Sequence, residues 1–468
     1  MAIPRGDGTI GNGPAAALLD RNFDERDSAL ARQALAILDR NWIGHATKPS
    51  PELYPHQWSW DSACHSIGYA RLDQVRAERE LESLFRGQWR NGMLPHIVFT
   101  EGERYFPGPE FWQTERSPDA PRSPQTSGIV QPPIHASAVL HVVRHAAEGE
   151  RAAAFARELL PKLAAWHEYI YRERVREGEG LAEVWHPWET GMDNSPPWDA
   201  PLARIELAAD DVPDYDRVDT EHASSFERPT KEHYDRYAYL VRLFREHGYR
   251  PDALREVSPF VVQAVIFNAL LVQANRDLAE LARSAGEDPG RYEEWAELTA
   301  EAMNGKLWDG AHALYADYDV RAGGLIATRT AAGFAPLYAG VPGDERAAAM
   351  VAGLDEAGVA LDAGEWALAS LPPGDPRFDP TLYWRGPIWP VMNWFLYRGL
   401  VRYGYLDLAK RVRAALVGLP RRSGFWEHYS PANGRGHGGE EFSWTAALVL
   451  DALFDQSSTA APKPGPDS

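Results

Sequence analysis

The segment ERDSALARQALAILDRNW, residues 25–42, shows the pattern that recurs along most of this chain and indicates its fold class. Leu30, Ala34, Leu38 and Trp42 recur every four residues with Ala36 among them, which is the spacing of an amphipathic helix. Similar patterns occur in eleven further segments, several of them joined by short Gly or Pro breaks that are typical of helical hairpins. These segments are residues 61–72, 75–90, 132–148, 152–174, 231–248, 258–285, 290–306, 343–357, 388–403, 406–418 and 442–455.

Strand signals are sparse and short, as at residues 325–327. We therefore predict an all-α fold in which twelve helices form six pairs, a toroid with an inner ring, an outer ring and a cleft at one end. The predicted domain covers residues 19–456. Residues 1–18 and 457–468 are rich in small residues and proline, and we expect both segments to be disordered. A repeat of fixed period, which a solenoid needs, is not visible.

The formal net charge of −19 makes nucleic acid an unfavourable partner, because phosphate backbones repel an acidic protein. The sequence has no basic run suited to a membrane surface and no apolar stretch long enough to span a bilayer. The N-terminus lacks the apolar segment of a signal peptide, and the single cysteine, Cys64, forms no internal disulfide. We expect a soluble, cytoplasmic protein. A homo-oligomer is compatible with this sequence.

The segment HPWETGMDNSPPWD, residues 186–199, is the most informative for chemistry. It holds the carboxylates Glu189, Asp193 and Asp199, and its Gly and Pro residues break any helix. A carboxyl group beside Trp and Pro is poorly solvated, which raises its pKa and suits a general acid. The alternative is a surface loop in which Asp and Asn only form turns.

A second carboxylate, Glu427, lies in GFWEHYSP at residues 424–431. Between aromatic residues it could take a proton from water, as a general base does. The residues alone leave Glu440 and Glu441 as competitors, and each glutamate has the alternative of capping a helix or forming a salt bridge.

Other segments combine aromatic and polar residues that suit sugar binding. In LYPHQWSWD, residues 53–61, Asp61 could bind two hydroxyls while Trp58 or Trp60 stacks on the ring; the alternative for Asp61 is a helix N-terminal residue. The amides Asn91 and Gln131 suit hydroxyl recognition. Within YWRGPIWP, residues 383–390, Arg385 is either a buried structural cation or a substrate contact.

Metal, nucleotide and nucleophile motifs are missing from the sequence. The 15 histidines are scattered without an HExxH pattern, and GRGHGG at residues 434–439 lacks the Lys-Ser/Thr of a phosphate loop. Cys64 is most simply a buried helix cysteine. We therefore expect no metal and no cofactor, and a small molecule as the only ligand.

Taken together, these segments resemble the bacterial members of glycoside hydrolase family 63, of the mannosylglycerate and glucosylglycerate hydrolase type. The WETGMD, QPP and WSWD elements also look like those of trehalases. The shared motifs span nearly the whole chain in order. They are LYPHQWSWD (53–61), QWRNGMLPHIVF (88–99), YFPGP (105–109), TSGIVQPPIHA (126–136), WETGMDNSPPWD (188–199), HYDRY (233–237), YWRGPIWPV (383–391) and SWTAALVLD (443–451).

The resemblance implies an (α/α)6 barrel with long active-site loops and hydrolysis with inversion, with Asp193 as general acid and Glu427 as general base. The two carboxyls of an inverting enzyme should lie roughly 6.5–9.5 Å apart. Glycerate would be held by Tyr105, Arg228 and Tyr234, since a guanidinium can grip a carboxylate with two hydrogen bonds. The residues implied to hold the sugar are Tyr54, Trp58, Trp60, Asp61, Gln131, Trp188, Tyr383, Trp384 and Trp389.

The sequence departs from the family pattern in two places that concern the choice of sugar. Relatives specific for glucosylglycerate carry a Gln just before the SWT element. This chain has Phe442 at that position, preceded by Glu441. We count Glu441 among the predicted substrate-binding residues. Thr190 stands where Ser is common. Glucose and mannose differ at one hydroxyl, so one lost contact shifts the preference by about 1–3 kcal/mol.

Three other functions compete with hydrolysis of a glycerate glycoside. The first is an α-glucosidase acting on a neutral disaccharide such as trehalose, which would not need Arg228. The second is a sugar-binding barrel without catalysis, which would need no matched acid and base. The third, a sugar epimerase, would need paired histidines near the cleft, and the sequence shows no such pattern.

Overall fold

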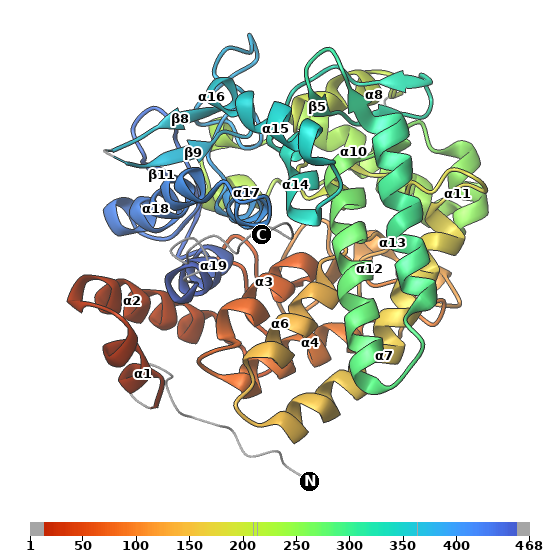
Figure 1. The fold of residues 1–468 in the computed structure, drawn as a ribbon. Coiled ribbons are helices and arrows are strands. Elements are labelled where there is room, and N and C mark those ends of the chain that lie inside the picture. The colour runs from red at the N-terminus through yellow and green to blue at the C-terminus, as the bar shows by residue number, and fades with distance from the viewer. Residues whose placement is uncertain (1–13, 209, 213, 363, 456–468) are drawn as a thin grey trace.

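Helices make up most of the computed structural model, which describes residues 14–208, 210–212, 214–362 and 364–455 (Figure 1). Eleven of the twelve predicted helical segments each overlap one long helix, so the helix-rich class is confirmed. These helices are α2 (Glu25–Asn41), α3 (Ser59–Tyr69), α4 (Gln74–Arg86), α6 (His135–His145), α7 (Gly149–Tyr169), α10 (Lys231–Glu246), α12 (Val265–Ala285), α13 (Gly290–Ala302), α17 (Pro390–Arg402), α18 (Leu406–Ser423) and α19 (Ser443–Phe454).

The twelfth segment, residues 343–357, is divided at Gly353 into two short helices, and six more short helices were not predicted. The short helices are α1 (Pro14–Asn22), α5 (Pro109–Trp112), α8 (Asp199–Ala203), α9 (Asp219–His222), α11 (Pro251–Val257), α14 (Ala335–Ala339), α15 (Asp344–Ala352) and α16 (Leu354–Ala357). Because α1 begins at Pro14, the predicted disorder is wrong for residues 14–18. Residues 1–13 and 457–468 lie outside the described residues.

Six helices contact one another in a cycle, in the order α3, α6, α12, α14, α17, α19 and back to α3. Figure 1 shows them around a common centre. We call these six the inner helices. Outside them, α4 packs on α3, α7 on α6, α13 on α12, α18 on α17 and α2 on α19.

The pattern of buried residues explains why some helices lie in the inner ring and others lie outside it. All but the last residue of α19 are buried, because this inner helix has neighbours on several sides. By contrast, α2 buries one face, which includes Leu30, Ala34 and Leu38, and leaves its charged face to solvent. Asp24 caps α2 by accepting a hydrogen bond from the backbone N–H of Asp27 at 2.8 Å.

Short antiparallel strand pairs shape the connections between the helices. The hairpin of β10 and β11 pairs His428 with His437 and contains a register shift beside Trp426. The remaining sheets are β1 with β2, β4 with β5, β8 with β9, and the three-stranded sheet β3-β6-β7. The strands are β1 (Gln57–Trp58), β2 (Ile97–Val98), β3 (Val262–Gln263), β4 (Trp308–Asp309), β5 (Leu314–Tyr315), β6 (Tyr318–Asp319), β7 (Gly324–Leu325), β8 (Gly358–Ala360), β9 (Trp366–Leu368), β10 (Trp426–Tyr429) and β11 (Gly436–Glu440).

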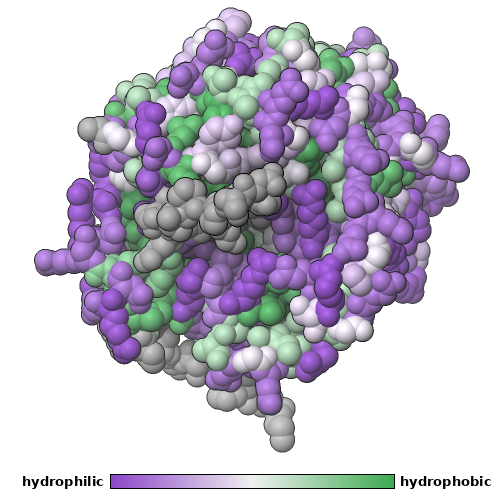
Figure 2. All heavy atoms as spheres, viewed as in Figure 1, coloured by the Kyte–Doolittle hydropathy of each residue, from purple (hydrophilic) through white to green (hydrophobic). Residues whose placement is uncertain are grey.

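Hydrophilic side chains cover most of the face shown in Figure 2, and apolar side chains are scattered among them. Within the described part of the chain, no helix has the length and apolar character needed to cross a bilayer.

Candidate active site

One pocket gathers thirteen of the fifteen predicted site residues. It lies at the N-terminal ends of inner helices, because Trp58, Trp389 and Phe442 are the residues directly before α3, α17 and α19. The positive ends of these helix dipoles therefore face a pocket that contains carboxylates. The predicted residues in its lining are Tyr54, Trp58, Trp60, Asp61, Tyr105, Gln131, Trp188, Asp193, Arg228, Tyr234, Tyr383, Trp389 and Glu427.

Two predicted residues lie outside this lining, and Trp384 is the first. Its indole is fully buried and stacks on Trp389, with ring centroids 3.7 Å apart and an interplanar angle of 4°. Its backbone N–H donates to Oδ1 of Asn194 at 3.0 Å. The prediction of a direct sugar contact is therefore corrected: Trp384 supports the pocket from behind Trp389.

Glu441 is the second exception. Its partly exposed carboxylate accepts hydrogen bonds from Nη2 and Nε of Arg40 at 2.6 and 3.0 Å. Consecutive side chains diverge at this turn, where Glu441 has a φ of +50°, so Phe442 lines the pocket instead. The prediction that Glu441 contacts the substrate is therefore wrong.

Six lining residues were not among the predicted site residues. At Gly191, one of these lining residues, a Cβ would lie 2.6 Å from the ring of Trp60, so only glycine fits there. His96 and Trp444 lie within the motifs of residues 88–99 and 443–451, and membership of these motifs was the signal that could have identified them. The six residues are Pro49, His96, Pro107, Gly191, Phe442 and Trp444.

The structure separates the three carboxylates of residues 186–199 by their partners. Glu189 is fully buried and accepts two hydrogen bonds from Arg174, at 2.8 and 3.0 Å. Asp199 pairs with Arg385, which settles Arg385 as a structural cation. Asp193 is left as the carboxylate that lines the pocket.

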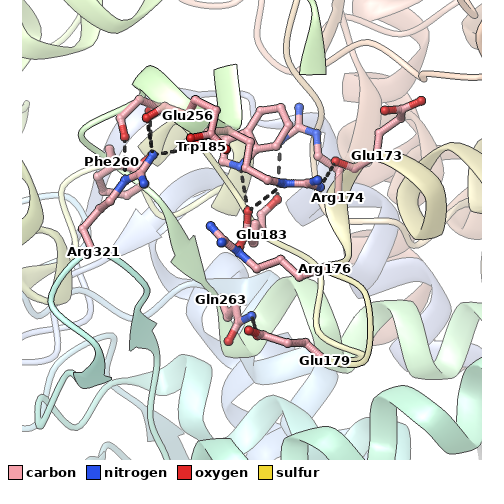
Figure 3. A network of polar contacts seen from close by, with 12 residues as sticks. Glu173, Arg174, Arg176, Glu179, Glu183, Trp185, Glu256, Phe260, Gln263 and Arg321 are labelled. Atoms are coloured by element: carbon pink, nitrogen blue, oxygen red, sulfur yellow. Dashed lines mark hydrogen bonds and ion pairs between the residues drawn. The ribbon is translucent and has the colours of Figure 1, made fainter. Parts of the chain in front are cut away.

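A polar network holds the chain before this loop in place. Glu183 pairs with Arg176 and accepts a hydrogen bond from Nε1 of Trp185 at 3.2 Å (Figure 3). The guanidinium of Arg174 lies 3.8 Å from the centre of the Trp185 ring. Because Glu189 also accepts the backbone N–H of Trp185, at 2.6 Å, the network fixes the start of the loop that carries Asp193.

Burial raises the pKa of Asp193 to about 7, the neighbouring charge of Glu427 adds to this shift, and Arg228 opposes it. The hydroxyl of Tyr237 donates to the backbone carbonyl of Asp193 at 2.8 Å, which holds the residue in place. A carboxyl group with this pKa is substantially protonated near neutral pH, which is the state that a general acid requires.

Glu427 is buried among donors. The hydroxyls of Tyr54 and Tyr383 donate to its Oε1 at 2.9 and 3.3 Å, and the backbone N–H of Gly439 donates to Oε2 at 3.0 Å. Burial raises the pKa of Glu427, whereas Arg228 and these hydrogen bonds lower it. Its rivals Glu440 and Glu441 do not line the pocket, so the position of Glu427 separates it from both.

Asp61 occupies the first turn of α3, as the alternative interpretation expected, and it also lines the pocket. Burial raises its pKa, and the charge of Glu427 adds to the shift. Gln131 accepts the backbone N–H of Trp60 with its Oε1 at 3.1 Å. Asn91 does not line the pocket; its Oδ1 accepts the backbone N–H of Met93 at 3.1 Å, which is a turn contact.

Among the described residues, Arg228 is the only arginine in the pocket lining, and it is 3% exposed. Its Nη1 donates to the hydroxyl of Tyr54 at 2.9 Å and lies 3.8 Å from Oε2 of Glu427, while its Nε donates to Asp219 at 3.3 Å. Asp219 also binds Arg217, whose guanidinium lies 3.7 Å from the centre of the Tyr234 ring. Neither Asp219 nor Arg217 was predicted from the sequence, because this arrangement depends on contacts across a loop.

No group of three or more His, Cys, Asp or Glu residues suited to a metal occurs among the described residues. Cys64 is buried in α3, and burial raises the pKa of its thiol, which disfavours the reactive thiolate.

A pocket that combines two dissimilar carboxyl groups with Trp and Tyr side chains is typical of a glycoside hydrolase. The model of the mannosylglycerate hydrolase MGH1-like glycoside hydrolase domain matches residues 54–445. The chain belongs to this family of glycosidases, and the resemblance found in the sequence is confirmed.

Named relatives and a solved structure agree. A mannosylglycerate hydrolase of Rubrobacter radiotolerans is 50% identical over 428 residues, 91% of this chain and 97% of the relative. A glucosylglycerate hydrolase of Mycolicibacterium hassiacum is 37% identical over 441 residues, again 91% and 97%. The crystal structure of the family 63 mannosylglycerate hydrolase of Thermus thermophilus in complex with Tris and D-glycerate has 43% identity and a TM-score of 0.84, covering 90% of this chain and 99% of that one.

Proposed function

We propose that this glycosidase hydrolyses an α-glycoside of glycerate, glucosylglycerate or mannosylglycerate, to free sugar and glycerate with inversion. The observation that carries the proposal is the meeting of Asp193, Glu427 and the buried Arg228 in one pocket. Its support also includes the names of the relatives and the D-glycerate in the Thermus structure.

In the proposed mechanism, protonated Asp193 gives its proton to the glycosidic oxygen as the bond from the anomeric carbon to that oxygen breaks. Glu427 takes a proton from a water molecule that attacks the opposite face of the sugar. The donors around Glu427 favour its ionised form, which a base needs. The mechanism requires the two carboxyl groups to lie roughly 6.5–9.5 Å apart.

Arg228 gives the proposed glycerate end a positive charge in a protein with net charge −19. Its Nη1 and Nε are hydrogen-bonded within the protein, and among the described residues its Nη2 has no hydrogen-bond partner. A substrate carboxylate can therefore bind at Nη2, with Tyr105 and Tyr234 as hydroxyl donors beside it.

We also propose an architecture for the chain. The cyclic contacts of the six inner helices support an (α/α)6 barrel formed by a single domain over residues 19–456. The cytoplasmic location predicted from the sequence stays a prediction.

A proton NMR time course tests the proposal. The purified protein is incubated with α-glucosylglycerate, α-mannosylglycerate and trehalose in parallel, and the first anomer of the released sugar is recorded. We expect the β-sugar to appear first from a glycerate compound and the Asp193→Asn variant to lose this activity. Turnover of trehalose alone would remove the glycerate site from the proposal, and α-sugar as first product would contradict inversion. The faster glycerate compound identifies the preferred sugar.

A further inference from the structure

A polar contact joins the loop that carries Arg228 to the hairpin that carries Glu427. Oε1 of Glu227 lies 2.9 Å from Nδ1 of His437, and Oε2 of Glu227 accepts the backbone N–H of Gly438 at 3.2 Å. The contact links positions 210 residues apart in the chain. We call the pair Glu227 and His437 the latch.

On the loop side, the latch lies directly beside Arg228. Glu227 ends the single 3₁₀ turn Ser225–Glu227, which has no buried residue, and Phe226 is 88% exposed. Apolar packing therefore does not hold this turn against the protein. The polar contacts of Glu227 hold it there, and a shift of Glu227 would move the adjoining peptide and with it the buried guanidinium of Arg228.

On the hairpin side, two successive backbone N–H groups bind two carboxylates. Gly438 donates to Glu227, and Gly439 donates to Oε2 of Glu427 at 3.0 Å. Successive N–H groups at a residue with positive φ form a concave anion site, and Gly438 has a φ of +73°. The segment 437–439 therefore fixes the loop and the proposed base relative to each other.

We propose that Glu227 and His437 are positioning residues for the aglycone site, because together they hold Arg228 where it can bind the carboxylate of glycerate. This inference rests on the proposed function. Neither residue lines the pocket, so both act through Arg228 and not by touching the substrate.

Calorimetric titration of the full-length protein tests the latch. D-glycerate and the free sugar of the preferred substrate are each titrated into wild type, Glu227→Ala and His437→Ala. The matched control is Glu232→Ala, which removes a glutamate whose side chain is 75% exposed on the neighbouring helix α10. We expect about tenfold weaker glycerate binding in both latch variants, with sugar binding and the control unchanged. KM for the glycerate substrate should rise by a similar factor, with kcat within about twofold.

A conservative variant and a stability measurement separate positioning from a merely structural role. His437→Asn, whose amide nitrogen can take the place of Nδ1, should recover most of the glycerate affinity, and thermal unfolding should show all variants folded. Unchanged glycerate affinity in both alanine variants, or an equal loss for sugar and glycerate, would overturn the inference. If wild type itself does not bind glycerate, the proposed function fails, and the inference fails with it.

Discussion

Raising the pH should switch the enzyme off through one buried carboxyl group, Asp193. Burial raises its pKa to about 7, and a general acid works only while it is protonated. With that pKa, about half of the molecules carry the proton at pH 7 and about one in a hundred at pH 9, so kcat/KM should fall about fifty-fold between these pH values. On the acidic side, activity should fall as Glu427 gains a proton, at a pH above the usual range for glutamate, because burial raises its pKa.

The assay is the initial rate at low substrate concentration from about pH 4 to pH 10, with wild type and Asp193→Asn side by side. The variant should keep only a small residual rate, without the decline above neutral pH. Removing the opposing cation by Arg228→Gln should move the basic limb to higher pH, because Arg228 lowers the pKa of Asp193. A constant kcat/KM from pH 7 to pH 9 in wild type, or the same decline in Asp193→Asn, would refute the assignment.

Three further outcomes are expected. Gly438→Ala should lower kcat more than about tenfold, because the new Cβ would lie 2.4 Å from Oε2 of Glu427; an unchanged kcat would contradict that close approach. In urea unfolding, Glu189→Ala should lower the free energy of unfolding by about 3–5 kcal/mol, because it removes the partner of the buried Arg174. Glu280→Ala, which breaks an exposed pair of similar geometry with Arg144, should lower it by less than about 1 kcal/mol. Comparable losses would disprove the role of burial. Glu441→Ala should leave KM unchanged in the same rate assay, and a severalfold rise would return Glu441 to the substrate site.

The helices that could be predicted from the sequence are the ones with strong local patterns. The repeat of apolar residues along α2 depends only on near neighbours in the chain, so the prediction for residues 25–42 nearly matches the observed bounds. The inner helix α14 was missed because five residues are too short for a periodic pattern. Its place in the cycle depends on packing against α12 and α17.

In the candidate site, too, some features could be predicted from the sequence and others depend on contacts between distant residues. The family resemblance carried by the motifs around Tyr54, Trp188 and Trp389 implied these aromatic residues, and the structure places all three in the pocket lining. Neighbouring residues in the sequence did not predict that Trp384 stacks on Trp389. They also did not predict that Glu441 turns away from the pocket. The stacking depends on two rings that meet in the folded chain, and the turn at Glu441 depends on its positive φ of +50°.

Local patterns and family motifs predicted a helix-rich glycosidase with Asp193 and Glu427 as its candidate acid and base. Which carboxylates are structural became clear from the fold, because the pairing of Glu189 with Arg174 removes Glu189 from the chemistry. The structure also brought Arg228 beside Glu427 from a position 199 residues earlier, 427 minus 228. The physical reason is that periodicity and turn chemistry are local, whereas charge pairing and burial depend on residues that meet only in the folded chain.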